Sequence, residues 1–209
     1  MSPQLSAVLP LSGWEDFYVI VGSSAAALTG LTFIVITISA DRNDRGGDTA
    51  VRRLTGLRAF ISPTVAHFTA SLWISAVLNV PGQTGLSLRV CLAVAGLIGV
   101  VYCGRVIYWM VRTFTDSQYT PFLEDWLWNA ILPVLAYLSL LGASWSLPMH
   151  PVPSLYVVGG VALLLLLVGI HNAWDVVAWI TTERHAHKYR HRGLDSPRHV
   201  SEARGEGKE

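Results

Sequence analysis

Long apolar stretches separated by short polar breaks dominate this chain. Each of five stretches is about 20 residues long or longer and nearly free of charge, which is the length that an α-helix needs to cross a hydrocarbon core. The breaks between them contain Gly, Pro, Asn and Asp, which are typical of turns. The sequence therefore predicts an all-α, polytopic transmembrane helix bundle of about five spans, at residues 15–39, 57–79, 87–111, 126–147 and 154–180.

The basic residues lie on alternate breaks. The first break and its flank contain five arginines, the third break follows Arg112, and the C-terminal segment is rich in Lys and Arg, whereas the second and fourth breaks contain none. Basic residues close to a span are retained on the cytoplasmic side. An odd number of spans, with the N-terminus outside and the C-terminus in the cytoplasm, accounts for this alternation.

Composition agrees with lipid as the solvent. Charged residues make up 14% of the chain, against about 25% in a typical soluble domain, and 52% of residues are apolar. The 15 basic and 14 acidic residues nearly cancel, which does not favour binding to nucleic acid. Residues 183–209 are charged and poor in large apolar side chains. We therefore expect a membrane bundle at 1–182, followed by a cytoplasmic tail whose helix extends one or two turns past the membrane.

Small side chains are concentrated in the first span. Small residues allow helix backbones to approach closely in a membrane. The residues concerned either pack this helix against a neighbour or line a narrow path, and they include Gly22, Ser23, Ala26, Thr29 and Gly30. Two acidic residues precede them, Glu15 and Asp16. These carboxylates either form an acidic outer mouth or simply favour the start of the helix through its dipole.

A second group of candidates lies toward the cytoplasmic ends of the spans. Ionisable residues inside a membrane are costly and are candidates for function. Counted from the outer ends of their spans, several polar residues reach a similar depth: Arg105, His171, Asn172, Asp175, Asn129 and Arg58. Two interpretations remain open. Arg105 and Asp175 form a pair that joins two helices, or the group handles protons or ions near a cytoplasmic gate.

Other residues favour structural roles. His67, after Pro63 in the second span, is expected to be a hydrogen-bonded core histidine rather than a metal ligand. Tryptophan and tyrosine lie near the expected membrane surfaces, as in an aromatic belt; the belt includes Trp14, Tyr18, Tyr108, Trp109, Trp126, Trp128 and Trp145. No metal site is predicted, no cofactor can be named, and no motif of a soluble enzyme is present.

Residues Gly13 to Arg42, with the sequence GWEDFYVIVGSSAAALTGLTFIVITISADR, and the Pro81-Gly82-Gln83 turn resemble a known family. It consists of small, largely uncharacterised bacterial multi-span membrane proteins, some of which are labelled "modulator of FtsH protease". The resemblance covers roughly a quarter of the chain and implies a location in the bacterial cytoplasmic (inner) membrane. It assigns no functional residue.

Three functions are compatible with these patterns. The first is a homo-oligomeric membrane protein that passes or senses an ion or a small solute. The second is a non-catalytic accessory or regulatory protein that binds another membrane protein, such as a membrane protease. The third is an intramembrane enzyme that acts on lipid or isoprenoid and uses His171 and Asp175.

Overall fold

The structure is a computed structural model that describes residues 11, 13–41, 47–116 and 123–194. Within the helices, the side chains of 36, 38–62, 113–116, 125, 176 and 179–194 lie outside the described part. Every regular element in the described residues is helical, which confirms the all-α prediction. In chain order these elements are α1 (Glu15–Asp41), α2 (Gly47–Leu78), α3 (Gly85–Asp116), α4 (Leu123–Trp126), the π-helical segment η2 (Leu127–Ile131), α5 (Leu132–Ser146) and α6 (Pro151–Leu194).

Four of the described helical segments are long and apolar enough to cross a membrane. They are Glu15–Val35, Gly85–Arg112, Leu127–Ser146 and Pro151–Asp175. Each coincides with one of the expected spans. The remaining expected span falls on α2, where a shorter apolar helix, Pro63–Leu78, lies within the described side chains. Length and composition thus indicate a multi-pass membrane protein.

The chain forms two compact units, the first ending at Ala173 and the second beginning at Trp174. Helix α6 continues to Leu194, further than the one or two turns that we expected beyond residue 180. Glu, Arg, Ala and Lys in this stretch favour helix, and no glycine or proline interrupts it before Gly193. Residues 195–209 of the expected tail lie outside the described residues.

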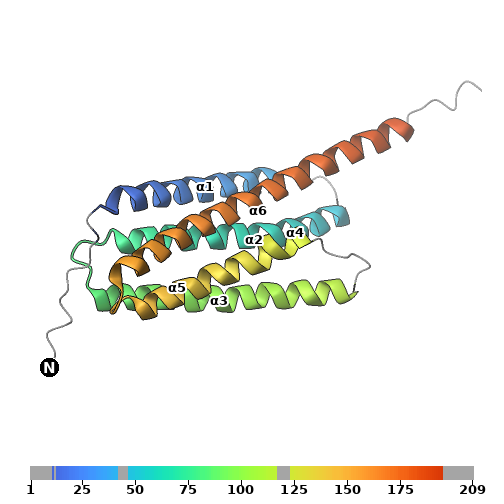
Figure 1. Cartoon of the computed structure of the whole chain (residues 1–209). Coiled ribbons are helices and arrows are strands. Elements are labelled where there is room, and N and C mark those ends of the chain that lie inside the picture. The colour runs from blue at the N-terminus through green and yellow to red at the C-terminus, as the bar shows by residue number, and fades with distance from the viewer. Residues whose placement is uncertain (1–10, 12, 42–46, 117–122, 195–209) are drawn as a thin grey trace, which may run out of the picture. The chain divides into compact units, whose positions relative to one another are not determined.

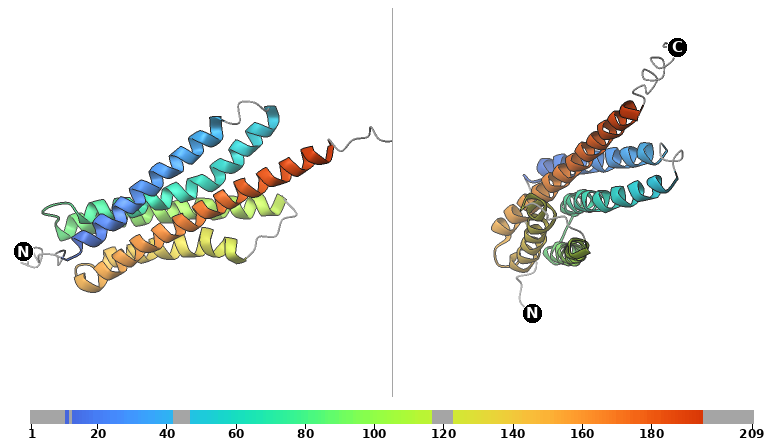
Figure 2. Two further views of the ribbon diagram at one scale, coloured as in Figure 1. Left: turned by 90° about the horizontal axis from the view of Figure 1, so that it is seen from above. Right: turned by 90° about the vertical axis from the view of Figure 1, so that its right-hand side faces the viewer.

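Neighbouring helices of the first unit pack as antiparallel pairs (Figures 1 and 2). Helix α1 lies along α2, and α3 lies along α5. The turn between α2 and α3 contains Gly82, whose φ of 67° is a left-handed conformation that suits glycine. We call the end of the bundle where α1 begins and α2 ends the Glu15 end, and the opposite end the His171 end.

The first part of α6 is the most enclosed helix. Leu155, Val158, Ala162, Leu165 and Val168 are all fully buried. Two glycines bring α6 close to its neighbours, because an added Cβ would lie 2.9 Å from the Trp14 ring at Gly159 and 2.5 Å from the Phe68 ring at Gly169. The interior of the bundle therefore lies between α6 and the two helix pairs.

The surface of the bundle is far more apolar than that of a soluble protein. Large apolar side chains lie outside, with Ile20 and Ile98 each 65% exposed. Polar side chains lie inside, and Thr64, His67 and Ser75 are each only 1% exposed. Water would disfavour so many exposed apolar groups, whereas lipid accepts them and disfavours exposed polar groups. The exposed apolar surface supports a membrane environment independently of helix length.

Candidate functional site

Helix α2 carries a line of buried polar side chains. Thr64, His67, Ser71 and Ser75 recur every three or four residues, so they share one helix face. Each is at most 1% exposed. We call these four residues the polar stripe, which extends over about 16 Å of the helix. Polar groups at this depth in a membrane protein are costly and are therefore candidates for function.

His67 lies between two tyrosines from other helices. Its Nδ1 is 3.2 Å from Oη of Tyr137 on α5. The ring of Tyr102 on α3 meets the imidazole edge to face, with the ring centroids 6.3 Å apart. The expectation of a buried, hydrogen-bonded core histidine is confirmed. The pair links α2 to α5 in the interior.

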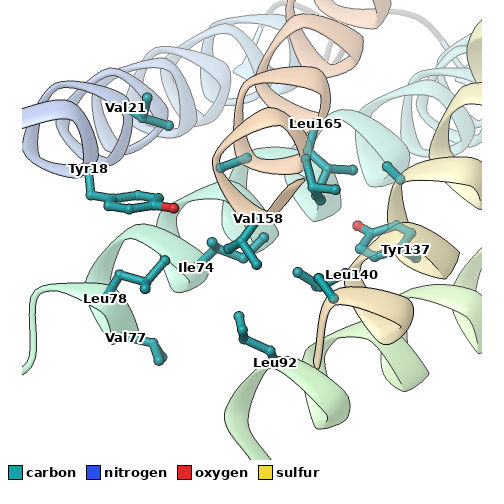
Figure 3. Close-up of a cluster of buried hydrophobic side chains, with 14 of the residues drawn as sticks. Tyr18, Val21, Ile74, Val77, Leu78, Leu92, Tyr137, Leu140, Val158 and Leu165 are labelled. Atoms are coloured by element: carbon teal, nitrogen blue, oxygen red, sulfur yellow. The ribbon is translucent and has the colours of Figure 1, made fainter. Parts of the chain in front are cut away.

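Gly99 on α3 provides the space for Tyr137. A Cβ added at this position would lie 2.0 Å from a carbon of the tyrosine ring, a separation that no side chain tolerates. Glycine is therefore required for Tyr137 to lie against α3 while its hydroxyl reaches His67. Figure 3 shows the hydroxyl groups of Tyr18 and Tyr137 pointing into the bundle from opposite sides.

The polar stripe contacts α6 and α1 toward the Glu15 end. Ser71 donates a hydrogen bond of 2.9 Å to the carbonyl oxygen of Ala162 on α6. One turn further, the Cβ of Ser75 would be 2.9 Å from a Cβ added at Gly22, so α1 and α2 approach closely there. Asn79, one turn beyond Ser75, is exposed and donates to the Ser75 carbonyl oxygen. The line of polar side chains therefore reaches the end of the helix.

Two hydroxyl groups at this end of the stripe are buried without a hydrogen-bond partner, Ser75 Oγ and Tyr18 Oη. Tyr18 precedes Gly22 by one turn on α1 and therefore lies on the same helix face, toward α2. Buried polar groups are normally hydrogen-bonded to protein or to ordered water. Both hydroxyls are accordingly positions where a water molecule or a polar ligand would be bound.

The His171 end contains a second polar group. The rings of His171 on α6 and Trp128 in η2 meet edge to face with their centroids 3.9 Å apart. His171 Nε2 is 4.0 Å from Oε1 of Glu124, whose side chain is 74% exposed. His171, which is 20% exposed, thus lies within ion-pair distance of a carboxylate at the surface of the bundle.

Segment η2 owes its wide turn to a proline. Pro133 has no N–H, so it cannot donate the α-helical hydrogen bond to the carbonyl of Asn129. The chain instead forms a π-turn, in which the Leu132 N–H bonds to the Leu127 carbonyl. Such turns frequently occur at functional sites. Here the turn contains Trp128, whose ring contacts the ring of His171.

Asn172 joins the polar stripe to the His171 end. Its side chain is 5% exposed, and both its amide nitrogen and its amide oxygen are buried without a hydrogen-bond partner. Gly169 on α6 packs against Phe68 on α2. Because these helices are antiparallel, Asn172, three residues after Gly169, and Thr64, four residues before Phe68, lie at one level.

The polar cluster expected from depth along the spans stays a prediction, and the structure places its described members as follows. His171 and Asn172 lie together on α6, and Asn129 lies in η2 beside Trp128. Arg105 is exposed on α3, and the side chain of Arg58 lies outside the described residues. Asp175 belongs to the second compact unit, so the Arg105–Asp175 pair stays a prediction.

The small residues of α1 divide between two faces. Gly22 is buried against Ser75 and serves helix packing. Ser23, Ala26 and Gly30 are exposed on the outside of the bundle, and Thr29 donates a hydrogen bond to the carbonyl of Ala25 in its own helix. Glu15 and Asp16 are exposed in the first turn of α1. None of the exposed residues lines the interior of this chain.

Several residues of the site had not been recognised from the sequence. Ser71 and Ser75 continue the spacing of Thr64 and His67, so helical periodicity was a sufficient signal for the polar stripe. The sequence predicts that Tyr18 and Trp128 belong to the aromatic belt, but Tyr18 is 1% exposed and Trp128 contacts His171. Their position near a span end could not distinguish an inward ring from one at the membrane surface. No protein-family model, characterised protein or solved structure matches this chain.

Proposed function

We propose that this chain is a multi-pass protein of the bacterial cytoplasmic membrane that passes an ion or a small solute through the interior of its helix bundle. In this proposal it crosses the membrane five times, with α2 as a span, the N-terminus outside and the C-terminus in the cytoplasm. Four long apolar helices and the alternation of basic residues support this arrangement. The Glu15 end then faces outward and the His171 end faces the cytoplasm.

The polar stripe is the observation that carries the proposal. Four consecutive turns of α2 place a polar side chain in the core, although apolar side chains would cost less in a membrane. Polar atoms without hydrogen-bond partners lie near both ends of the stripe, at Ser75 and at Asn172. A species that entered between the helices would find hydrogen-bonding groups at every turn from Asn79 to Thr64, over about 22 Å.

The position of the path differs from the one that small residues on the first span suggested. The exposed face of α1 lies outside the bundle, whereas the polar stripe lies inside a single chain. We therefore propose that the path lies within the protomer and that homo-oligomers contain one path per chain. Glu15 and Asp16 lie at the outer end and would raise the local concentration of cations.

Flux through reconstituted protein tests this proposal. Purified protein in liposomes is expected to increase the permeability to at least one small ion or polar solute over that of empty liposomes. Changing Ser75 to Leu should abolish the increase, because a large apolar side chain would fill the stripe beside Gly22. Ser23→Leu, on the exposed face of α1, is the matched control and should retain it, provided that both variants remain folded by circular dichroism.

The outcome that would contradict the proposal is a folded protein with no permeability above background for any ion or solute tested. Equal flux through wild type and Ser75→Leu would also contradict it, since the stripe would then not be the path.

A second function is favoured by the exposed face of α1. Ser23, Ala26 and Gly30 are small and exposed, and an added Cβ at Gly30 meets nothing within 4 Å. Faces of this kind allow another transmembrane helix to approach closely. An accessory protein would use such a face to bind a membrane protein, a membrane protease being the example that the family resemblance suggests. Ala26→Leu and Gly30→Leu should then abolish copurification of the partner while leaving liposome flux unchanged.

A further inference from the structure

The buried polar side chains of the bundle are all neutral hydrogen-bonding groups. Among the described residues they comprise threonine, serine, asparagine and histidine, and they include no carboxylate, lysine or arginine. The described residues also contain no cluster of three histidine, cysteine or acidic side chains that could hold a metal ion. A dehydrated metal cation requires about six oxygen ligands or a ring of carbonyl groups, which this interior does not gather at one point.

A proton has a smaller requirement. It needs a continuous line of groups that each donate and accept a hydrogen bond, because it moves by exchange of bonds rather than by passage of the whole ion. Hydroxyl and imidazole groups do both. The polar stripe consists only of hydroxyls and one imidazole, and the hydroxyls of Tyr18 and Tyr137 point into the same interior (Figure 3).

The spacing of the stripe suits single water molecules. Side chains one helical turn apart have Cβ atoms about 5–6 Å from each other. A water molecule that makes hydrogen bonds of about 2.8 Å to each neighbour spans this distance. Ser75 Oγ, Tyr18 Oη and the Asn172 amide are buried without partners in the described structure, and these are the groups that such waters would satisfy.

We propose that the ion is the proton, and that it crosses the bundle between Asn79 and Glu124 along the hydroxyls and imidazole of the polar stripe, internal waters that the Asn172 amide helps to hold, and His171, with His67 as the central relay. This inference rests on the function proposed above and specifies its ion. Both ends of the line are exposed, Asn79 at the Glu15 end and Glu124 at the His171 end. Between these two ends, the polar stripe contains one buried polar side chain per helical turn of α2, and Asn172 lies at the level of its last residue, Thr64.

At His67 the step is balanced in protons and bonds. A proton from a water on one side forms an N–H bond at the unprotonated ring nitrogen, and the N–H bond at the other nitrogen breaks as its proton passes to the next oxygen. The imidazole is left neutral as its other tautomer, and rotation of the ring and of the hydroxyls restores the starting state. The titratable groups that face the ring are Tyr137 from α5 and Tyr102 from α3. At the second relay, Glu124 and Trp128 face His171.

Proteoliposomes with a pH-sensitive dye inside test the assignment. A potassium diffusion potential is imposed with valinomycin at equal internal and external pH, and acidification is followed in H2O and in D2O. Sodium and chloride fluxes are measured on the same preparation. Wild type is expected to acidify the lumen faster than empty liposomes, to do so more slowly in D2O, and to leave sodium and chloride impermeant.

Three variants locate the path. His67→Leu removes the central relay and is expected to reduce acidification to the rate of empty liposomes. Thr64→Val is nearly isosteric and should give a strong reduction without a change in folding, which covers the case in which His67→Leu does not fold. Ser144→Ala is the matched control, because Ser144 is also buried but donates to the Arg89 carbonyl outside the stripe. This variant should conduct as wild type does.

The outcomes separate this inference from the function on which it rests. Sodium or chloride flux without proton flux overturns the assignment of the proton and keeps the proposed function. Proton flux that His67→Leu and Thr64→Val both leave intact overturns the path along the stripe. No flux of any species in folded protein overturns both.

Discussion

Helices α1 and α2 are both rich in small polar residues, but they use their hydroxyl groups differently. On α1, Thr29, Thr32 and Thr37 each donate to the carbonyl four residues earlier in the same helix. On α2, Ser71 donates to a different helix, and His67 bonds to Tyr137 on α5. The threonine hydroxyls of α1 are satisfied within their own helix and can face lipid, whereas Ser71 and His67 of α2 connect helices.

Spacing explains the difference. The small residues of α1 are nearly consecutive, from Gly22 to Gly30 with only Leu28 between them, and so they surround the helix and include exposed positions. The polar residues of α2 recur at intervals of three or four, which confines them to one buried face. Composition alone would make α1 the polar helix of this protein. Periodicity identifies α2.

The largest effect is expected from filling the space beside Tyr137. Gly99→Ala places a methyl group where the tyrosine ring lies, so the ring must move away from His67 or the helices must separate. Overpacking of this kind costs roughly 1–3 kcal/mol, measurable as a lower thermal unfolding temperature in detergent. Gly30→Ala on α1 is the control, because its methyl group meets nothing within 4 Å. Equal unfolding temperatures for the two variants would contradict the packing described here.

A smaller effect is expected from the bond between α2 and α5. His67→Phe and Tyr137→Phe each leave a buried polar group without its partner, so each should destabilise the protein. The double variant should be more stable than the sum of the two single destabilisations predicts, and the difference is the coupling free energy, about 1 kcal/mol. Denaturant unfolding of the four proteins in mixed micelles measures this coupling, and strict additivity would show that the two groups do not interact.

The smallest effect is expected on α1. Thr29→Val removes a hydroxyl that bonds only within its own helix, and we expect a change in unfolding free energy within about 0.5 kcal/mol and unchanged liposome flux. If this substitution abolished flux while the fold persisted, the contrast between α1 and α2 would be reversed, and the first helix would line the path.

The sequence was sufficient to predict where the helices lie along the chain, but it was not sufficient to predict the side-chain contacts inside the bundle. Apolar length located every long helix, and the Asn79–Gly85 break lies between α2 and α3 as expected. The buried role of His67 also followed from its position in a span. Periodicity could have revealed Ser71 and Ser75 as well, because each lies one turn from the residue before it.

Other contacts depend on tertiary packing that no local pattern encodes. Nothing in the sequence near Gly99 indicates that Tyr137 lies against it, because the two residues belong to different helices. The inward rotation of Tyr18 and Trp128 likewise depends on which helix occupies the neighbouring position. Depth along a span predicts that His171 and Asn172 lie near the end of the bundle expected to face the cytoplasm, but it could not specify that Trp128 and Glu124 would lie beside His171.

The π-turn at Leu127–Ile131 has a consequence for both histidines. Trp128 lies within it and contacts His171, while Tyr137 lies beyond it and bonds to His67. One extra residue in a turn changes the rotational phase of everything that follows by about 100°. The angle between Trp128 and Tyr137 around this helix therefore depends on the π-turn at Pro133, and a regular α-helix in its place would misalign one histidine contact whenever the other was kept.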